Sequence, residues 1–311
     1  MSELLLTGAS GHLGSAVLKK LQRAGNYEVT ALVNSPASAE RLRKLTAGSN
    51  VRVVAADLAA ELPAIIRESR FSAVVHCGAY VAKVADEDHA RAQLYATNVR
   101  GTANLLAALG ERMEHFIFVS SLAVYAQTAY DRAISEDAEC EPPTFYGASK
   151  LIGERMARMH CDAIGAGLSV LRTHSVYGPG ETQSRALPTF FKHALEGKSI
   201  FLAGMGRAKR NYVYVNDAAD AVLSCLAARS FGVANIAGEQ VFSLAELAQE
   251  VVRACGADSG VCQLPGTSRD LVLDTTHARE AFGITCNTPL AQGIAAQRAW
   301  LSAKRDFYEL L

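Results

Sequence analysis

The sequence has no excess of charge of either sign, because 31 Lys and Arg residues balance 31 Asp and Glu residues. No global basic field is available to attract nucleic acid or an anionic membrane, so any recognition of phosphate must be local. No uncharged run approaches the roughly 20 residues that span a bilayer, and no basic segment precedes the first apolar run. These absences predict a cytoplasmic protein without nucleic-acid or membrane partners.

The seven cysteines include no pair with CxxC spacing. An odd, scattered set of thiols suits neither a disulfide framework nor a zinc site. We therefore expect reduced thiols and no metal. The rest of the composition, 50% hydrophobic and 20% charged over 311 residues, is typical of one or two globular domains with a large core.

Short apolar runs rich in β-branched residues alternate with longer segments of helical periodicity. Strands are expected at 4–6, 29–33, 51–55, 73–76, 116–119 and 169–171, and helices at 15–24, 90–109 and 146–164. This alternation predicts an α/β fold, a doubly wound parallel sheet with helices on both faces. Ligands of such sheets bind at the carboxyl ends of the strands.

The character of the sequence changes near residue 175, where Pro, Gly and Arg become frequent in predicted loops. We expect residues 1–175 to form a dinucleotide-binding Rossmann domain that carries the catalytic residues. Residues 176–311 would form mainly a smaller α/β substrate-binding lobe, with some segments returning to the Rossmann sheet.

A glycine-rich segment, Thr7-Gly-Ala-Ser-Gly-His-Leu-Gly14, follows the first predicted strand and opens a helix. Gly8 suits a tight turn, Gly11 lets the backbone approach a pyrophosphate, and Gly14 lets the helix pack closely on the strand. The helix N-terminus then offers N–H groups and a positive dipole end to phosphate. An ordinary glycine turn is the alternative, but the strand and helix around it favour dinucleotide binding.

The second predicted strand ends Leu32-Val33-Asn34, without the acidic residue that usually holds the ribose of NAD. A 2'-phosphate would meet no repulsion here, so either NAD or NADP is expected, with a lean toward NADP. Arg41, Arg43 and Lys44 follow, although basic residues on a helix are more often a solvated face.

The segment Tyr146-Gly-Ala-Ser-Lys150 predicts a phenol that acts as a base. Tyrosine normally ionises near ~10, so it acts as a base at neutral pH only where a nearby cation favours the phenolate. Residues four apart share one face of a helix, and Lys150 is therefore expected to be that cation. An interface tyrosine and a solvated lysine are the alternatives when each is taken alone.

With these motifs, the chain resembles the extended short-chain dehydrogenase/reductases over nearly its whole length, in particular the NAD-dependent epimerase/dehydratase group that acts on nucleotide sugars. Further segments carry the resemblance: Asp57-Leu58, Val75–Ala79, Asn98–Asn104, Val119–Tyr125, Leu171–Pro179 and Arg210–Asp217. The cofactor site that it implies comprises Gly8, Ser10, Gly11, His12, Leu13, Gly14, Asn34, Asp57, Leu58, Cys77, Gly78, Ala79, Tyr146 and Lys150. It also implies that Asn98 supports the core and the active-site helix, and that helices 90–109 and 146–164 form a homodimer.

The resemblance aligns Ser121 with the family's catalytic serine or threonine, counted back from Val124-Tyr125. Its hydroxyl can donate to and accept from a substrate oxygen while Tyr146 moves the proton. Ser120 is the competitor, since adjacent strand residues point to opposite faces and only one can reach the pocket. Ser121, Tyr146 and Lys150 are the implied catalytic residues, and hydride would pass to or from the nicotinamide.

Departures from the family pattern narrow the implied function. Leu122-Ala123 occupies the place of the Asp-Glu pair that drives elimination in sugar 4,6-dehydratases, which argues against dehydration. Ser175 replaces the substrate-contacting Asn of an Arg-x-x-Asn segment, which weakens the nucleotide-sugar assignment.

The resemblance implies that Ser121, His174, Ser175, Arg210 and Arg269 bind the substrate. Guanidinium groups suit a diphosphate, although a surface ion pair is the alternative for each arginine. For His174 the alternative is a packed or hydrogen-bonded histidine.

The sequence thus predicts an NAD(P)-dependent oxidoreductase or epimerase acting on a secondary alcohol or ketone of a small molecule, with a nucleotide sugar as the favoured substrate. A ketone or sugar reductase that releases NADP at each turnover is the first alternative. A non-catalytic regulator that senses dinucleotides ranks lower, because such a protein is expected to have lost the Tyr or the Lys.

Overall fold

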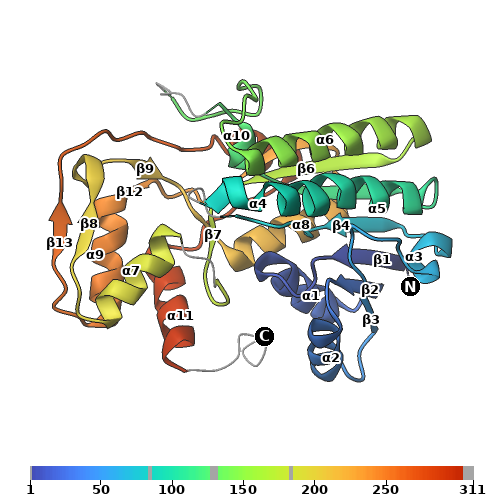
Figure 1. Ribbon diagram of the computed structural model, residues 1–311, viewed down its shortest axis with the longest axis horizontal. Helices are drawn as coiled ribbons and strands as arrows, with labels where there is room; N and C mark the ends of the chain where they lie inside the picture. Colours follow the sequence, from blue (N-terminus) through green and yellow to red (C-terminus); the bar gives the residue numbers. More distant parts are fainter. Residues whose placement is uncertain (1, 83–85, 127–131, 182–184, 304–311) are drawn as a thin grey trace.

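A seven-stranded parallel sheet lies at the centre of the computed structural model, which describes residues 2–82, 86–126, 132–181 and 185–303 (Figure 1). Its strand order is β11-β6-β5-β4-β1-β2-β3. The strands are β1 (Ser2–Thr7), β2 (Tyr27–Val33), β3 (Val51–Ala55), β4 (Ala73–His76), β5 (His115–Ser121), β6 (Gly167–Thr173) and β11 (Gly232–Ile236). The predicted doubly wound parallel sheet is confirmed, and each of the six expected strands is present.

The edge strand β11 is the one member of this sheet that the sequence pattern does not single out. It pairs with β6 from Gly232 opposite Ser169 to Ile236 opposite Thr173. Parallel pairing requires a long crossover, and here residues 174–231 lie between β6 and β11 along the chain.

Helices cover both faces of the sheet, as Figure 1 shows. The core on one face includes residues of α1 (His12–Ala24), α2 (Pro36–Leu45) and α8 (Val215–Ala228). The core on the other face includes residues of α3 (Ala64–Glu68), α5 (Gly101–Leu109) and α6 (Phe145–Ile164). Alternate residues of β1 enter opposite cores, because successive side chains of a strand point to opposite faces.

The helix expected at 90–109 is present but is not uniform. It consists of α4 (Glu87–Leu94), a π-helical segment at Tyr95–Arg100 and α5. The π-helical segment contains the buried Asn98, whose side chain bonds to other parts of the chain. Such wide turns are rare and frequently occur at functional sites.

A second group of elements has a core of its own and stands at the left of the sheet in Figure 1. It contains α7 (Ala186–Leu195), α9 (Leu244–Cys255), α11 (Leu290–Ser302) and the parallel pair β8 (Ile200–Leu202) and β13 (Val261–Gln263). Four short strands form two further pairs: β7 (Val176–Tyr177) with β10 (Val213–Tyr214), and β9 (Lys209–Arg210) with β12 (Phe242–Ser243). Helix α10 (Thr276–Phe282) packs against β11 and α8. None of the helices in the described part of the chain is long and apolar enough to cross a membrane.

Candidate active site

The glycine loop after β1 packs backbone against backbone. Gly8 has φ +67, and a Cβ added to it would lie 2.7 Å from the backbone N of Gly78. A Cβ added to Gly14 would lie 2.1 Å from the carbonyl oxygen of Gly8. The expected tight turn and the close packing of helix on strand are both confirmed. Helix α1 starts at His12 with Gly11 as its N-cap and no capping side chain, so its first turn suits a phosphate-bearing group.

Loops after β1, β3 and β4 meet beside this turn. The Thr7 hydroxyl accepts a hydrogen bond from Gly78 N at 3.1 Å and pairs with His76 Nδ1 at 2.6 Å. A Cβ on Gly78 would lie 2.9 Å from Leu58 Cδ1. The structure therefore brings together most of the predicted cofactor residues, which are Gly8, Ser10, Gly11, His12, Leu13 and Gly14 with Leu58, Cys77, Gly78 and Ala79.

At the end of β2, Val33 is buried in the core and the next residue, Asn34, is exposed. The basic residues that follow have other partners: Arg43 Nη2 donates to Val53 O at 3.2 Å and Lys44 pairs with Glu40 at 3.0 Å. Neither contact points to a reserved site for a 2'-phosphate. The exposed Asp57 accepts from Ala59 N at 2.9 Å within its own turn.

Helix α6 places Tyr146 in its first turn, where the backbone N–H groups have no partner within the helix. Thr144 accepts from Gly147 N at 3.1 Å, and the Glu87 carboxylate accepts from Phe145 N at 2.9 Å and from Tyr146 N at 3.3 Å. Glu87 thus fixes the start of this helix from α4. No local sequence motif identifies Glu87, because its contact spans 58 residues.

Ser121, at the end of β5, is hydrogen-bonded to the Tyr146 side chain. Burial raises the pKa of Tyr146, while the charge of Arg185 and the hydrogen bond with Ser121 lower it. Arg185 lies at the N-terminus of α7 and belongs to no motif that sequence reasoning would select.

Lys150 lies one turn along α6 from Tyr146 and is buried, with Nζ 4.3 Å from the centroid of the Phe118 ring. Burial lowers the pKa of Lys150 to about 8, and the nearby Glu154 and Cys77 oppose that shift. The Lys150 ammonium is therefore near its titration point at neutral to slightly alkaline pH. Its charge also lowers the pKa of both His76 and Cys77, whose thiol pKa burial raises to about 12.

Asn98 holds α6 from the π-helical segment. Its Nδ2 donates to Ser149 Oγ at 2.9 Å and to Tyr80 O at 3.0 Å, and Ser149 Oγ donates in turn to Tyr146 O at 2.7 Å. The expectation that Asn98 supports the helix of Tyr146 is confirmed.

Ser120, the competitor of Ser121, faces away from Tyr146. It is buried, and its hydroxyl donates to the carboxylate of Glu154. Of the two serines, Ser121 is the one beside the tyrosine, which supports its assignment as the catalytic serine.

Two segments far apart in the sequence lie together at the predicted substrate arginines. Arg210 Nη1 donates to Lys209 O at 2.6 Å and to Arg269 O at 2.7 Å, while Leu271 N donates to Lys209 O at 3.0 Å. Arg269 is exposed on the second of these segments. The structure therefore brings Arg210 to the backbone of Arg269, with one guanidinium nitrogen of Arg210 bound to two carbonyl oxygens.

His174 is buried and engaged within the chain. Its Nε2 donates to Leu271 O at 3.0 Å, its Nδ1 accepts from Ser175 N at 2.6 Å, and its ring lies 5.2 Å from that of Tyr212. Burial lowers the pKa of His174 to about 3, so the ring is neutral. These contacts favour the hydrogen-bonded histidine, with Ser175 as its neighbour, over a direct role for His174 toward substrate.

A histidine of the glycine loop connects it to the loop after β7. His12 Nε2 donates to Pro179 O at 3.1 Å, and burial lowers the pKa of His12 to about 4, so the ring is neutral. Farther along that loop, burial raises the pKa of Glu181 to about 7, and Gln297 Nε2 of α11 donates to its carboxylate at 3.4 Å. The cofactor loop is thereby joined to Pro179, and Glu181 is joined to α11.

The profile of the NAD dependent epimerase/dehydratase family matches residues 4–237. A dTDP-glucose 4,6-dehydratase of Streptomyces griseus is 28% identical, covering 100% of this chain and 97% of that protein. A dTDP-L-rhamnose 4-epimerase of Burkholderia thailandensis is 25% identical, over 98% and 96% respectively. The crystal structure of UDP-glucuronic acid 4-epimerase from Bacillus cereus in complex with NAD superposes with a TM-score of 0.84 at 22% identity, covering 97% of this chain and 99% of that one.

Proposed function

Because this chain belongs to the NAD dependent epimerase/dehydratase family of enzymes, we propose that it is an NAD-dependent epimerase of a nucleotide sugar. The observation that carries the proposal is the hydrogen bond between Ser121 and the half-buried Tyr146. It stands beside a glycine loop that leaves no space for side chains at Gly8 and Gly14. Curated relatives that act on dTDP sugars and span nearly the whole chain support the substrate class.

The glycine loop and the uncapped start of α1 would hold the pyrophosphate of NAD, and the loops at Leu58 and Cys77–Ala79 would line the rest of the cofactor. When bound, the nicotinamide would supply the group that takes the hydride from a substrate carbon and returns it. The protein's own residues position the substrate, exclude water and move the proton.

Tyr146 would take the proton of the substrate hydroxyl as the carbon loses its hydride, and Ser121 would hold the same oxygen through its hydroxyl. Return of the hydride to the opposite face of the ketone, with return of the proton from Tyr146, would complete an epimerisation. Because burial raises the pKa of Tyr146, cationic neighbours are needed for proton removal, and Arg185 acts in that direction. Lys150, one turn away, would complete the cationic surroundings.

Epimerisation is favoured over dehydration by the residues that follow Ser121. Elimination of water requires an acid and a base placed on the sugar, whereas Leu122 and Ala123 offer neither. A reductase would use the same Ser121 and Tyr146 but would consume its reduced cofactor with each ketone. The two functions therefore differ in cofactor stoichiometry.

We assign NAD rather than NADP as the cofactor, following the family. The lean toward NADP depends on the missing carboxylate at Val33 alone, and the partners of Arg43 and Lys44 give it no support.

We also propose that the protein is a homodimer through α6 and the π-helical segment. Large apolar side chains are exposed on these neighbouring helices, with Tyr95 61%, Ile152 45% and Met159 73% accessible. Light scattering coupled to gel filtration tests this, and Met159→Lys should shift the protein toward the monomer.

The test of function is incubation of the purified protein with NAD and a panel of UDP and dTDP hexoses, followed by NMR and mass spectrometry of the sugar. An epimer of unchanged mass is expected without added reduced cofactor, and loss of water or a requirement for NADPH would contradict the proposal.

Tyr146→Phe should bind NAD normally but lower kcat by at least ~100-fold, because only the proton-transfer group is removed. Near-normal turnover in this variant would overturn the role of Tyr146.

A further inference from the structure

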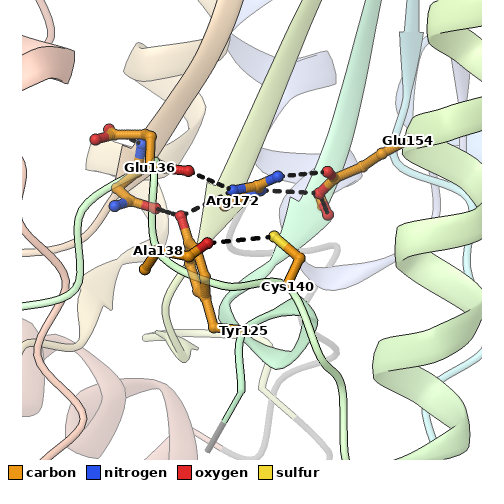
Figure 2. A network of polar contacts seen from close by, with 8 residues as sticks. Tyr125, Glu136, Ala138, Cys140, Glu154 and Arg172 are labelled. Atoms are coloured by element: carbon orange, nitrogen blue, oxygen red, sulfur yellow. Dashed lines mark hydrogen bonds and ion pairs between the residues drawn. The ribbon is translucent and has the colours of Figure 1, made fainter. Parts of the chain in front are cut away.

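A buried carboxylate that the proposed reaction does not use lies on the same helix as Tyr146 and Lys150. Glu154 of α6 forms a bidentate ion pair with Arg172 of β6: Nε donates to Oε1 at 3.1 Å and Nη2 donates to Oε2 at 2.8 Å. Both side chains are at most 8% exposed (Figure 2). A third donor reaches the same carboxylate, because the Ser120 hydroxyl bonds to Oε1.

The rest of the network fixes Arg172. Its Nη1 donates to the Tyr125 hydroxyl and to Glu136 O, each at 3.1 Å, and its guanidinium carbon lies 4.9 Å from the centroid of the Tyr125 ring. The Tyr125 hydroxyl donates onward to Asn235 of β11 at 2.7 Å. Strands β5, β6 and β11 and helix α6 are thus joined by one set of buried contacts, as Figure 2 shows for its labelled members. Buried networks of this kind hold one arrangement of side chains because every polar group has a partner.

This network borders the proposed catalytic groups on two sides. Ser120 and Ser121 are neighbours on β5, so their side chains point to opposite faces of the strand. The bond from Ser120 to Glu154 fixes one of these faces, and it therefore holds the Ser121 hydroxyl on the other face toward Tyr146. Glu154 also lies one helical turn beyond Lys150, and both side chains are buried.

The other groups around Lys150 offer its ammonium little compensation for burial. They are the Phe118 ring of β5 and His76 and Cys77 at the end of β4, and burial keeps the imidazole and the thiol neutral near pH 7. Arg172 and Cys140 face Glu154 from β6 and from the segment before α6. Glu154 is therefore the fixed negative charge beside Lys150.

We propose that Glu154 is a positioning residue for the reaction. It ties the strand of Ser121 to the helix of Tyr146 through Ser120 and Arg172, and it provides the counter-charge that keeps Lys150 an ammonium. The inference rests on the proposed function, because it assigns Glu154 a role through the residues to which that function gives the chemistry.

Two variants separate these roles. Glu154→Gln removes the charge but keeps an amide oxygen that can accept from Ser120, whereas Ser120→Ala removes the link and keeps the charge. The Lys150 charge is measured directly from the pH dependence of its side-chain ¹³Cε resonance, assigned by its absence in Lys150→Met. This measurement requires neither cofactor nor substrate.

Glu154→Gln should lower the pKa of Lys150 by about one unit, since loss of an opposite charge disfavours the ammonium. The alkaline limb of kcat should move to lower pH by the same amount, because the ammonium is lost as pH rises through that lower pKa. Ser120→Ala should leave the pKa of Lys150 unchanged and should lower kcat several-fold with an unchanged KM. An unshifted resonance in Glu154→Gln would overturn the counter-charge role, and a wild-type kcat in Ser120→Ala would overturn the link.

Glu154→Gln leaves the Arg172 guanidinium buried without its partner, and this variant can fail to fold. The double variant Glu154→Gln/Arg172→Met removes both charges and should lower the pKa of Lys150 by a smaller amount, because loss of the Arg172 cation acts in the opposite direction. A pair that served only stability would leave Lys150 unshifted in the double variant. If Tyr146→Phe instead retained full activity, the proposed function would fail while the resonance would still report the effect of Glu154 on Lys150.

Discussion

The cofactor side and the substrate side of the site are held together in different ways. On the cofactor side, backbone meets backbone, with Gly8 against Gly78 and Gly14 against Gly8. On the substrate side, single side chains reach the carbonyls of distant segments, as Arg210 reaches Arg269 and His174 reaches Leu271. The cofactor side has no space for an added Cβ, whereas on the substrate side one side-chain contact can change without the others. This difference permits a fold to keep one cofactor while its substrates vary.

The largest effect is expected from Gly14→Ala on the cofactor side. Its Cβ would lie 2.1 Å from Gly8 O, so backbone must move. Overpacking typically costs about 1–3 kcal/mol of stability, and here the displaced atoms also form the proposed phosphate site. NAD affinity in isothermal titration should fall at least ~100-fold, which is about 2.7 kcal/mol. Gly260→Ala is the matched control, since its Cβ would meet only Ser199 Oγ at 3.5 Å, and equal behaviour of the two variants would refute the backbone argument.

Next in size is the effect of Ser121→Ala, at the boundary between the two sides. Loss of the hydroxyl that faces Tyr146 should lower kcat by roughly 100-fold, within the usual range for a group that assists proton transfer. Steady-state kinetics of Ser121→Ala and Ser120→Ala provide the check. Because Ser120 bonds to Glu154 and not to Tyr146, Ser120→Ala should lower kcat by a smaller factor. Greater sensitivity at Ser120 would mean that the orientation of this strand is misassigned.

A smaller effect is expected from Arg210→Ala on the substrate side. A phosphate contact remote from the reacting carbon stabilises ground and transition states alike, so KM should rise about tenfold with little change in kcat. Arg269→Ala should act in the same direction but less strongly, since that side chain is exposed. Arg253→Ala, which removes an exposed pair with Glu250 on α9, is the control. An unchanged KM would favour a substrate without a diphosphate.

The smallest effect concerns the choice of dinucleotide. Val33→Asp should weaken NADP binding relative to NAD by about tenfold, because a carboxylate at the end of β2 repels a 2'-phosphate. Val33 is buried, so the variant should also melt at a lower temperature. Titration of both dinucleotides into Val33→Asp and into Asn34→Asp, one residue later and exposed, shows which position faces the ribose. Strong selectivity for NAD in the unmodified protein would mean that another group recognises the ribose.

The features that sequence alone predicts are those encoded locally. The glycine loop, the six strands and the pairing of Tyr146 with Ser121 follow from short motifs and from the alternation of apolar runs. Arg185 and Glu87 do not follow, because both act on Tyr146 from elements distant in sequence, Arg185 through its charge and Glu87 through a hydrogen bond, and neither belongs to a periodic pattern. Strand β11 is not predicted for a related reason, because it returns to pair with β6 only after α7, β8 and α8. His174 shows the converse, since its motif position suggests substrate contact while Leu271 and Ser175 occupy its ring nitrogens.

The π-helical segment at Tyr95–Arg100 has a consequence for how this region accommodates a change in chain length. A π turn holds one more residue than an α turn, so α4 and α5 are offset in rotational phase. Deleting one residue within the segment can close it to an ordinary α turn and leave both flanking helices facing as they do now. The same deletion in α4 or α5 would rotate everything beyond it by about 100°, the angle between successive residues of an α-helix. A deletion in this segment therefore preserves the orientation of α4 and α5, but it disrupts the bonds of Asn98 to Tyr80 and Ser149.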